Sequence, residues 1–215
     1  MPFARCFSVL LLLAGSGLAA PRQRAVVLGT WHTVKTLADS GETGEVRIRK
    51  LLVDGRVVEY TSGLPHDVTD RVFVIRRAYR INDALPPRPE NEPPPPQWVW
   101  RLDGWISVDR FTGRVIPLNL PAFDSETSQA SWYRDYAAYC GTSEDGAKGY
   151  LVVWQLGKRR PILSKESSGP GCAPPQWERT PSRVTFIVAG EKSSFVIRSR
   201  GADPQPEPRE EEGPQ

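Results

Sequence analysis

The stretch YAAYCGTSEDGAKGYLVVWQLGKRRPILSK, residues 136–165, decides the fold class of this chain. Its centre, Tyr150–Gln155, is rich in β-branched and aromatic residues, which favour strands. The segments on either side, Ser143–Gly146 and Leu156–Lys158, supply the glycine and polar residues of turns. The stretch therefore predicts three short antiparallel strands, and the first of them carries Cys140.

The same pattern of short apolar runs and turn signals continues outward on both sides. Residues 45–61 alternate around Asp54-Gly55 as a hairpin does, and residues 97–120 and 183–200 have similar layouts. Strands alternating with helices are not indicated, so a parallel sheet is not expected. We predict an all-β chain, an antiparallel meander of about ten short strands that forms a sandwich or an open barrel, with a partial propeller as a third arrangement. One short helix could form near residues 125–136, where Ser125 or Thr127 could cap it.

The first residues have the composition of a secretory signal. Arg5 precedes an apolar run, residues 7–14, and small residues follow up to Ala19. We expect residues 1–19 to be a signal peptide, and the mature protein to be periplasmic or secreted. The run is shorter than the roughly 20 residues that span a bilayer, so we expect no transmembrane segment after signal cleavage.

Two further segments do not suit a sheet. Residues 85–97, LPPRPENEPPPPQ, hold seven prolines and predict an exposed proline-rich connector. Residues 203–215 carry five acids and one arginine without a large apolar side chain, which predicts a disordered acidic tail. Residues 20–202 are expected to form a single β-rich domain.

Beyond the leader the chain keeps two cysteines, Cys140 and Cys172. In an oxidising compartment two such residues indicate one structural disulfide bond. They are far apart in sequence and no C-x-x-C motif is present, so a redox thiol is the weaker interpretation.

Three tryptophans, Trp98, Trp100 and Trp105, are the candidate ligand-stacking residues. Trp98 and Trp100 share one face of a regular strand, where exposed rings would stack on sugar or apolar peptide. The alternative is that these rings fill the core. A second route to a partner is strand addition at an edge such as Arg183–Ala189.

Signatures of catalysis are weak. The only histidines are His32 and His66. A metal site could be drawn from His32, His66, Asp67 and Asp70, and a hydrolase triad from Ser62 or Ser40 with His66 and Asp70. Their spacing is not diagnostic, and no G-x-S-x-G elbow or phosphate-binding glycine motif is present. We assign no catalytic residue, no metal and no cofactor. The chain has no dense basic run, so we expect no nucleic-acid partner.

Three stretches in the C-terminal third carry a resemblance: DYAAYCG at 135–141, QLGKRRP at 155–161 and PPQWERTPSRVTF at 174–186. They resemble a group of uncharacterised exported bacterial proteins. The resemblance implies a bacterial envelope location and transfers no catalytic residue. The sequence thus predicts a non-catalytic binding or structural module of the envelope, with an envelope protein or a glycan as partner. The alternative is a periplasmic hydrolase or metal-dependent enzyme that uses His66 and nearby acids.

Overall fold

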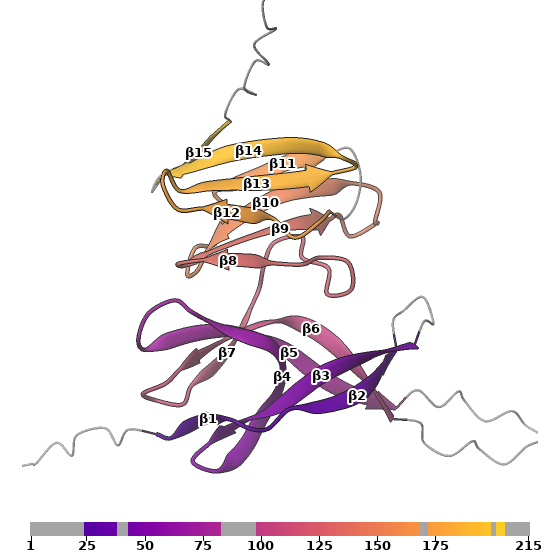
Figure 1. Cartoon of the computed structure of the whole chain (residues 1–215), viewed down its shortest axis with the longest axis vertical. Coiled ribbons are helices and arrows are strands. Elements are labelled where there is room, and N and C mark those ends of the chain that lie inside the picture. The colour runs from indigo at the N-terminus through magenta and orange to yellow at the C-terminus, as the bar shows by residue number, and fades with distance from the viewer. Residues whose placement is uncertain (1–23, 38–42, 83–97, 168–171, 199–200, 205–215) are drawn as a thin grey trace, which may run out of the picture.

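The computed structural model of this protein describes residues 24–37, 43–82, 98–167, 172–198 and 201–204. These residues form fifteen strands in three sheets and no helix, which confirms the all-β, mainly antiparallel prediction. Figure 1 shows two stacked parts: an N-terminal unit, strands β1–β7, and a C-terminal sandwich, strands β8–β15. The expected leader and the connector 85–97 lie outside the described residues, as does the tail except for Asp203 and Pro204 at the end of β15.

The N-terminal unit is one strongly curved sheet. Its strands are β1 (Val26–Leu28), β2 (His32–Leu37), β3 (Thr43–Val53), β4 (Arg56–Asp67), β5 (Val72–Asn82), β6 (Trp98–Asp109) and β7 (Val115–Leu118). Strands β2 to β6 form an antiparallel meander, except that the proline-rich stretch separates β5 from β6 along the chain. The sheet closes on itself because β2 pairs in parallel with β6 at Thr36 and Trp100. The unit is therefore a small barrel, with β1 and β7 added to β3 and β6.

Alternating residues fill the core of this barrel. Leu51, Phe73, Ile75, Ile106 and Val108 form a buried cluster. Phe73 lies opposite Val108 and Ile75 opposite Ile106 in the β5–β6 ladder, and directly opposed residues share one face of a sheet. The hairpin predicted at Asp54-Gly55 is present, with both residues at positive φ, as its tight turn requires.

The C-terminal part is a sandwich of two four-stranded antiparallel sheets. One sheet holds β8 (Ser131–Tyr133), β9 (Tyr136–Thr142), β10 (Gly149–Gln155) and β11 (Leu163–Ser167), and the other β12 (Gln176–Glu178), β13 (Arg183–Val188), β14 (Glu191–Arg198) and β15 (Gly201–Pro204). The expected disulfide is present, with a Cα–Cα distance of 5.8 Å, and joins Cys140 of β9 to Cys172 ahead of β12. The edge strand expected at 183–189 is an interior strand, because β13 lies between β12 and β14.

The first sheet of the sandwich is buried on both faces. Ala138 and Val153 face the second sheet, whereas Tyr139 and Val152 pack with Leu120 and other residues on the opposite side. This double burial explains why β9 and β10 have nearly continuous apolar runs where a half-buried strand would alternate.

A connecting segment, residues 119–130, leads from the barrel to the sandwich, and the helix expected near 125–136 is not formed there. Asp124 accepts hydrogen bonds from the backbone N–H groups of Glu126 (2.7 Å) and Thr127 (2.9 Å), so it caps a single turn as a helix cap would. That turn does not continue, because residues 131–133 pair with β9 instead. The helix prediction was wrong because a capping residue stabilises only the first turn. Continuing that turn into a helix needs an apolar face that can pack, and this stretch lacks one.

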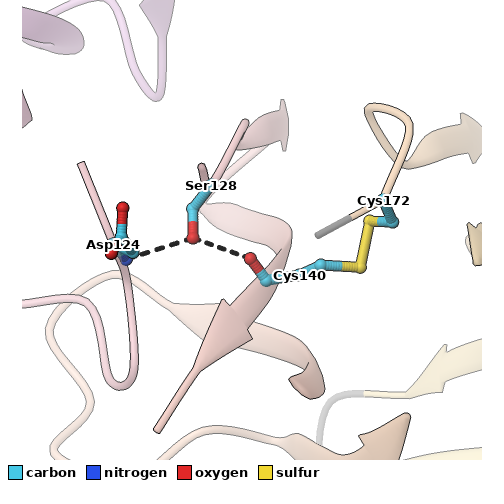
Figure 2. Close-up of a disulfide and its surroundings, with 4 residues drawn as sticks. All are labelled: Asp124, Ser128, Cys140 and Cys172. Carbon is cyan, nitrogen blue, oxygen red and sulfur yellow. Dashed lines mark hydrogen bonds between the residues drawn. A yellow bond between two sulfur atoms is a disulfide. The ribbon is translucent and has the colours of Figure 1, made fainter. Parts of the chain in front are cut away.

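The connecting segment also covers the edge of β9 that extends beyond β8. β8 pairs only with residues 136–138, so among the described strands none pairs with the rest of that edge of β9. The Ser128 hydroxyl donates to the carbonyl oxygen of Cys140 at 2.7 Å (Figure 2), and the N–H of Thr142 donates to the Ala122 carbonyl at 2.8 Å. The approach is so close that a Cβ at Gly141 would lie 2.5 Å from the oxygen of Ala122. Glycine at position 141 is therefore required by packing.

Candidate ligand-binding site

The two parts of the molecule meet through aromatic side chains. The rings of Trp105 from β6 and Trp132 from β8 lie 5.4 Å apart, and His66 from β4 stacks against Trp132 at 6.0 Å. The Nε2 of His66 also donates to the carbonyl oxygen of Arg134 at 2.7 Å. His66 thus joins the barrel to the sandwich.

Arg76 fixes the connecting segment against β5. Its guanidinium donates to three backbone carbonyls: that of Asp103 from Nε at 3.0 Å, that of Ser128 from Nη1 at 3.3 Å, and that of Ser125 from Nη2. Burial lowers the pKa of Arg76, and the opposite charges of Asp103 and Asp124 act against that effect. The side chain therefore contributes a partly buried positive charge solvated mainly by carbonyl dipoles.

A cleft of about 380 Å³ lies beside Arg76, between the barrel, the connecting segment and the sandwich. Leu64, Leu102 and Trp105 supply its apolar wall, and Glu126 and Gln129 of the connecting segment contribute polar groups. Its volume lies within the range of small-ligand sites, and such sites favour the junctions between structural units.

Local backbone features build the mouth of this cleft. The β4–β5 ladder shifts register between Ser62 and His66, and Gly63 adopts a φ of 73°. Leu64 follows the glycine and is 78% exposed, so it projects without a strand partner. On the far side Pro174 completes the cleft, two residues after the disulfide-bonded Cys172.

The three predicted tryptophans occupy different environments. Trp105 lines the cleft and packs on Trp132. Trp98 is 52% exposed at the start of β6, and the guanidinium of Arg80 lies 4.6 Å from its ring centre. Trp100 is half-buried, and its ring packs edge-to-face on the ring of Tyr60, with the two ring centres 4.8 Å apart. The structure therefore does not bring the three into one stacking platform.

Three residues of the alternative enzymatic interpretation are engaged elsewhere. Asp67 forms an ion pair with Arg110 at 2.5 Å, and the Ser62 hydroxyl donates to the Arg47 carbonyl at 2.9 Å. His66 faces Arg134 and is not among the residues that line the cleft. In the part of the chain that the structure describes, no group of three histidine, cysteine or acidic side chains could hold a metal ion. In that same part, no helix has the length and apolar character needed to cross a membrane.

Sequence reasoning did not find most of the cleft. Leu64 lies in a Gly-Leu-Pro loop, where an exposed leucine could have drawn notice, but Gln129 and Arg76 carry no local signal. Comparison with known proteins adds no further information, because no protein-family model, no curated protein and no solved structure matches the chain.

Proposed function

We propose that this protein is a non-catalytic binding module of the bacterial envelope, and that its ligand occupies the cleft between the barrel and the sandwich. The observation that carries the proposal is the cleft itself, a 380 Å³ space in which Trp105 and Leu64 lie beside polar groups from Arg76, Glu126 and Gln129. The signal peptide predicted for residues 1–19 and the disulfide between Cys140 and Cys172 support an extracytoplasmic location.

The ligand class that suits this lining is an uncharged glycan. Sugar rings present C–H faces to indole and leucine and hydroxyl groups to carboxylate, amide and guanidinium partners. The cleft combines both kinds of surface. Binding is favoured over hydrolysis because the Ser62 hydroxyl and the His66 ring are each hydrogen-bonded to a backbone carbonyl, and they do not pair as nucleophile and base.

The test is a thermal-shift and calorimetric titration of the oxidised mature protein with neutral oligosaccharides, including N-acetylglucosamine oligomers. We expect Leu64→Ala and Gln129→Ala to weaken binding about fivefold or more, since each removes contact surface or a hydrogen bond worth about 1 kcal/mol. Both side chains are exposed, so the variants should fold. Val27→Ala, at an exposed apolar residue of β1, is the matched control and should bind as the wild type does.

Two results would contradict the proposal. One is an oligosaccharide that binds equally well to all three variants, because its site would then lie elsewhere. The other is turnover of the bound oligosaccharide, which would make the protein an enzyme.

A further inference from the structure

Two arginines of β3 converge on one tryptophan at the break between β1 and β2. The guanidinium carbons of Arg47 and Arg49 lie 5.1 Å and 4.2 Å from the ring centre of Trp31. Residues two apart on a strand point to the same face, so β3 presents both cations on one side. Trp31 lies between the end of β1 and the start of β2, the two strands that share this edge of β3.

Within the part of the barrel that the structure describes, this pair lacks the carboxylate partners that other arginines have. Arg71 pairs with Asp109, and Arg77 pairs with Glu59 and Asp103. Among the described residues, neither Arg47 nor Arg49 forms a salt bridge with a carboxylate.

In the strand ladders of the described residues, the positions opposite the pair hold no acid. Glu45, the next acid on the same face of β3, lies opposite Lys35 in the β2–β3 ladder. The residue opposite Arg47 in that ladder is the uncharged Thr33. Two like charges therefore lie against a single ring with no acid directly opposite either of them.

Arg49 also has donor capacity that the protein does not use. Its Nη2 donates to the carbonyl oxygen of Gly63 at 3.3 Å, but its buried Nε has no hydrogen-bond partner among the residues that the structure describes. Burial lowers the pKa of this guanidinium. Holding two cations together, one of them partly desolvated, costs free energy that a bound anion would offset.

We propose that Arg47 and Arg49, oriented by Trp31, form a binding site for phosphate groups. A guanidinium can donate two parallel N–H hydrogen bonds to two oxygens of one phosphate. Stacking on an indole restricts the rotamers of the arginine before the anion arrives. A phosphate can accept hydrogen bonds from two arginines at once, because it has more acceptor oxygens than one guanidinium can use. The phosphate could belong to a polymer or to a lipid headgroup. The site lies on different residues from the cleft and does not depend on the function proposed for it.

The experiment measures binding of the oxidised mature protein to two probes: inorganic polyphosphate, and vesicles that contain phosphatidylglycerol in phosphatidylcholine. We expect Arg47→Gln and Arg49→Gln each to raise the Kd about tenfold or more, because each removes charge-assisted hydrogen bonds. Raising the salt concentration should weaken wild-type binding.

Two matched variants control for general charge. Lys50→Gln removes an exposed cation from the opposite face of β3, and Arg80→Gln removes an arginine stacked on another tryptophan, Trp98. Both should leave the Kd within about twofold of the wild type. Binding to polyphosphate alone identifies a polymer as the source of the phosphate, and binding to the vesicles alone identifies a lipid headgroup; either supports the site.

The proposal is overturned if the wild type binds neither probe, or if all four variants weaken binding equally. The latter result would indicate diffuse attraction to a basic surface. If Arg49→Gln fails to fold, Arg47→Gln decides, because the Arg47 side chain is exposed and its removal should not disturb the barrel. Retained binding in that variant would contradict the proposal.

Discussion

Replacing Ser128 by alanine should reveal how strongly the connecting segment holds the sandwich. Ser128 is 1% exposed, donates its hydroxyl proton to the Cys140 carbonyl at 2.7 Å, and accepts a hydrogen bond from the Asp124 N–H at 3.1 Å (Figure 2). Alanine removes one oxygen atom and changes little in shape. The variant therefore isolates the two hydrogen bonds.

The magnitude follows from what the substitution leaves unpaired. A buried carbonyl without a donor costs about 1–3 kcal/mol, and the Asp124 N–H adds up to about 1 kcal/mol because it is less deeply buried. We expect the free energy of unfolding to fall by about 1–4 kcal/mol. With a urea m-value of about 2 kcal/mol/M, the midpoint should fall by about 0.5–2 M.

The assay is urea unfolding of the oxidised protein, followed by tryptophan fluorescence and by circular dichroism. Ser164→Ala is the control, because Ser164 is exposed on β11 and should change stability by less than about 0.5 kcal/mol. A loss below that value for Ser128→Ala would refute the reasoning, since the hydrogen bonds across the edge of β9 would then contribute nothing.

Three further predictions test packing, the junction and the response to acid. Gly141→Ala should destabilise the protein by about 1–3 kcal/mol or more in the same urea assay, because the new Cβ would lie 2.5 Å from a carbonyl oxygen; Gly44→Ala, with nothing within 4 Å, should not. His66→Ala should lower the free energy of unfolding by about 1–2 kcal/mol, because it removes the hydrogen bond to the Arg134 carbonyl. Zinc should not raise the melting temperature of the wild type. A zinc-dependent rise that is lost in the variant would instead indicate a metal site. Hydrogen bonds from backbone N–H groups hold the pKa of Asp124 below its ordinary value of 3.8, so its contribution to stability is complete above that value and is lost as the pH falls through the lower folded-state pKa. Melting temperatures between pH 2 and 7 should consequently fall less steeply for Asp124→Asn than for the wild type, and parallel profiles would contradict this.

Local sequence determined the strands and several of their turns. Asp54-Gly55 specifies its hairpin because few residue pairs adopt two positive φ angles at low cost. The apolar runs at 136–141 and 150–155 specify strands, and Cys140 and Cys172 form the disulfide that was predicted from the two cysteines beyond residues 1–19. These features depend on backbone preferences and composition, which are properties of a few adjacent residues or of the whole chain.

The expected helix near 125–136 marks the limit of such reasoning. Ser125 and Thr127 give the local signal of a helix start, and Asp124 caps one turn there, yet Ser131–Tyr133 joins β9 as a strand. Pairing with β9 decided between helix and strand for these residues, and a short sequence window does not contain that partner.

Only the tertiary structure decided how the strands are closed and where a ligand could bind. The parallel pairing of Thr36 with Trp100 joins residues far apart in the chain, and the candidate cleft combines Leu64, Trp105 and Gln129 from separate segments. The sequence by itself determined an all-β chain with a disulfide, because strand propensity and turn chemistry act over a few residues. The barrel closure and the cleft depend on register and packing between distant segments, and no local pattern encodes those distances.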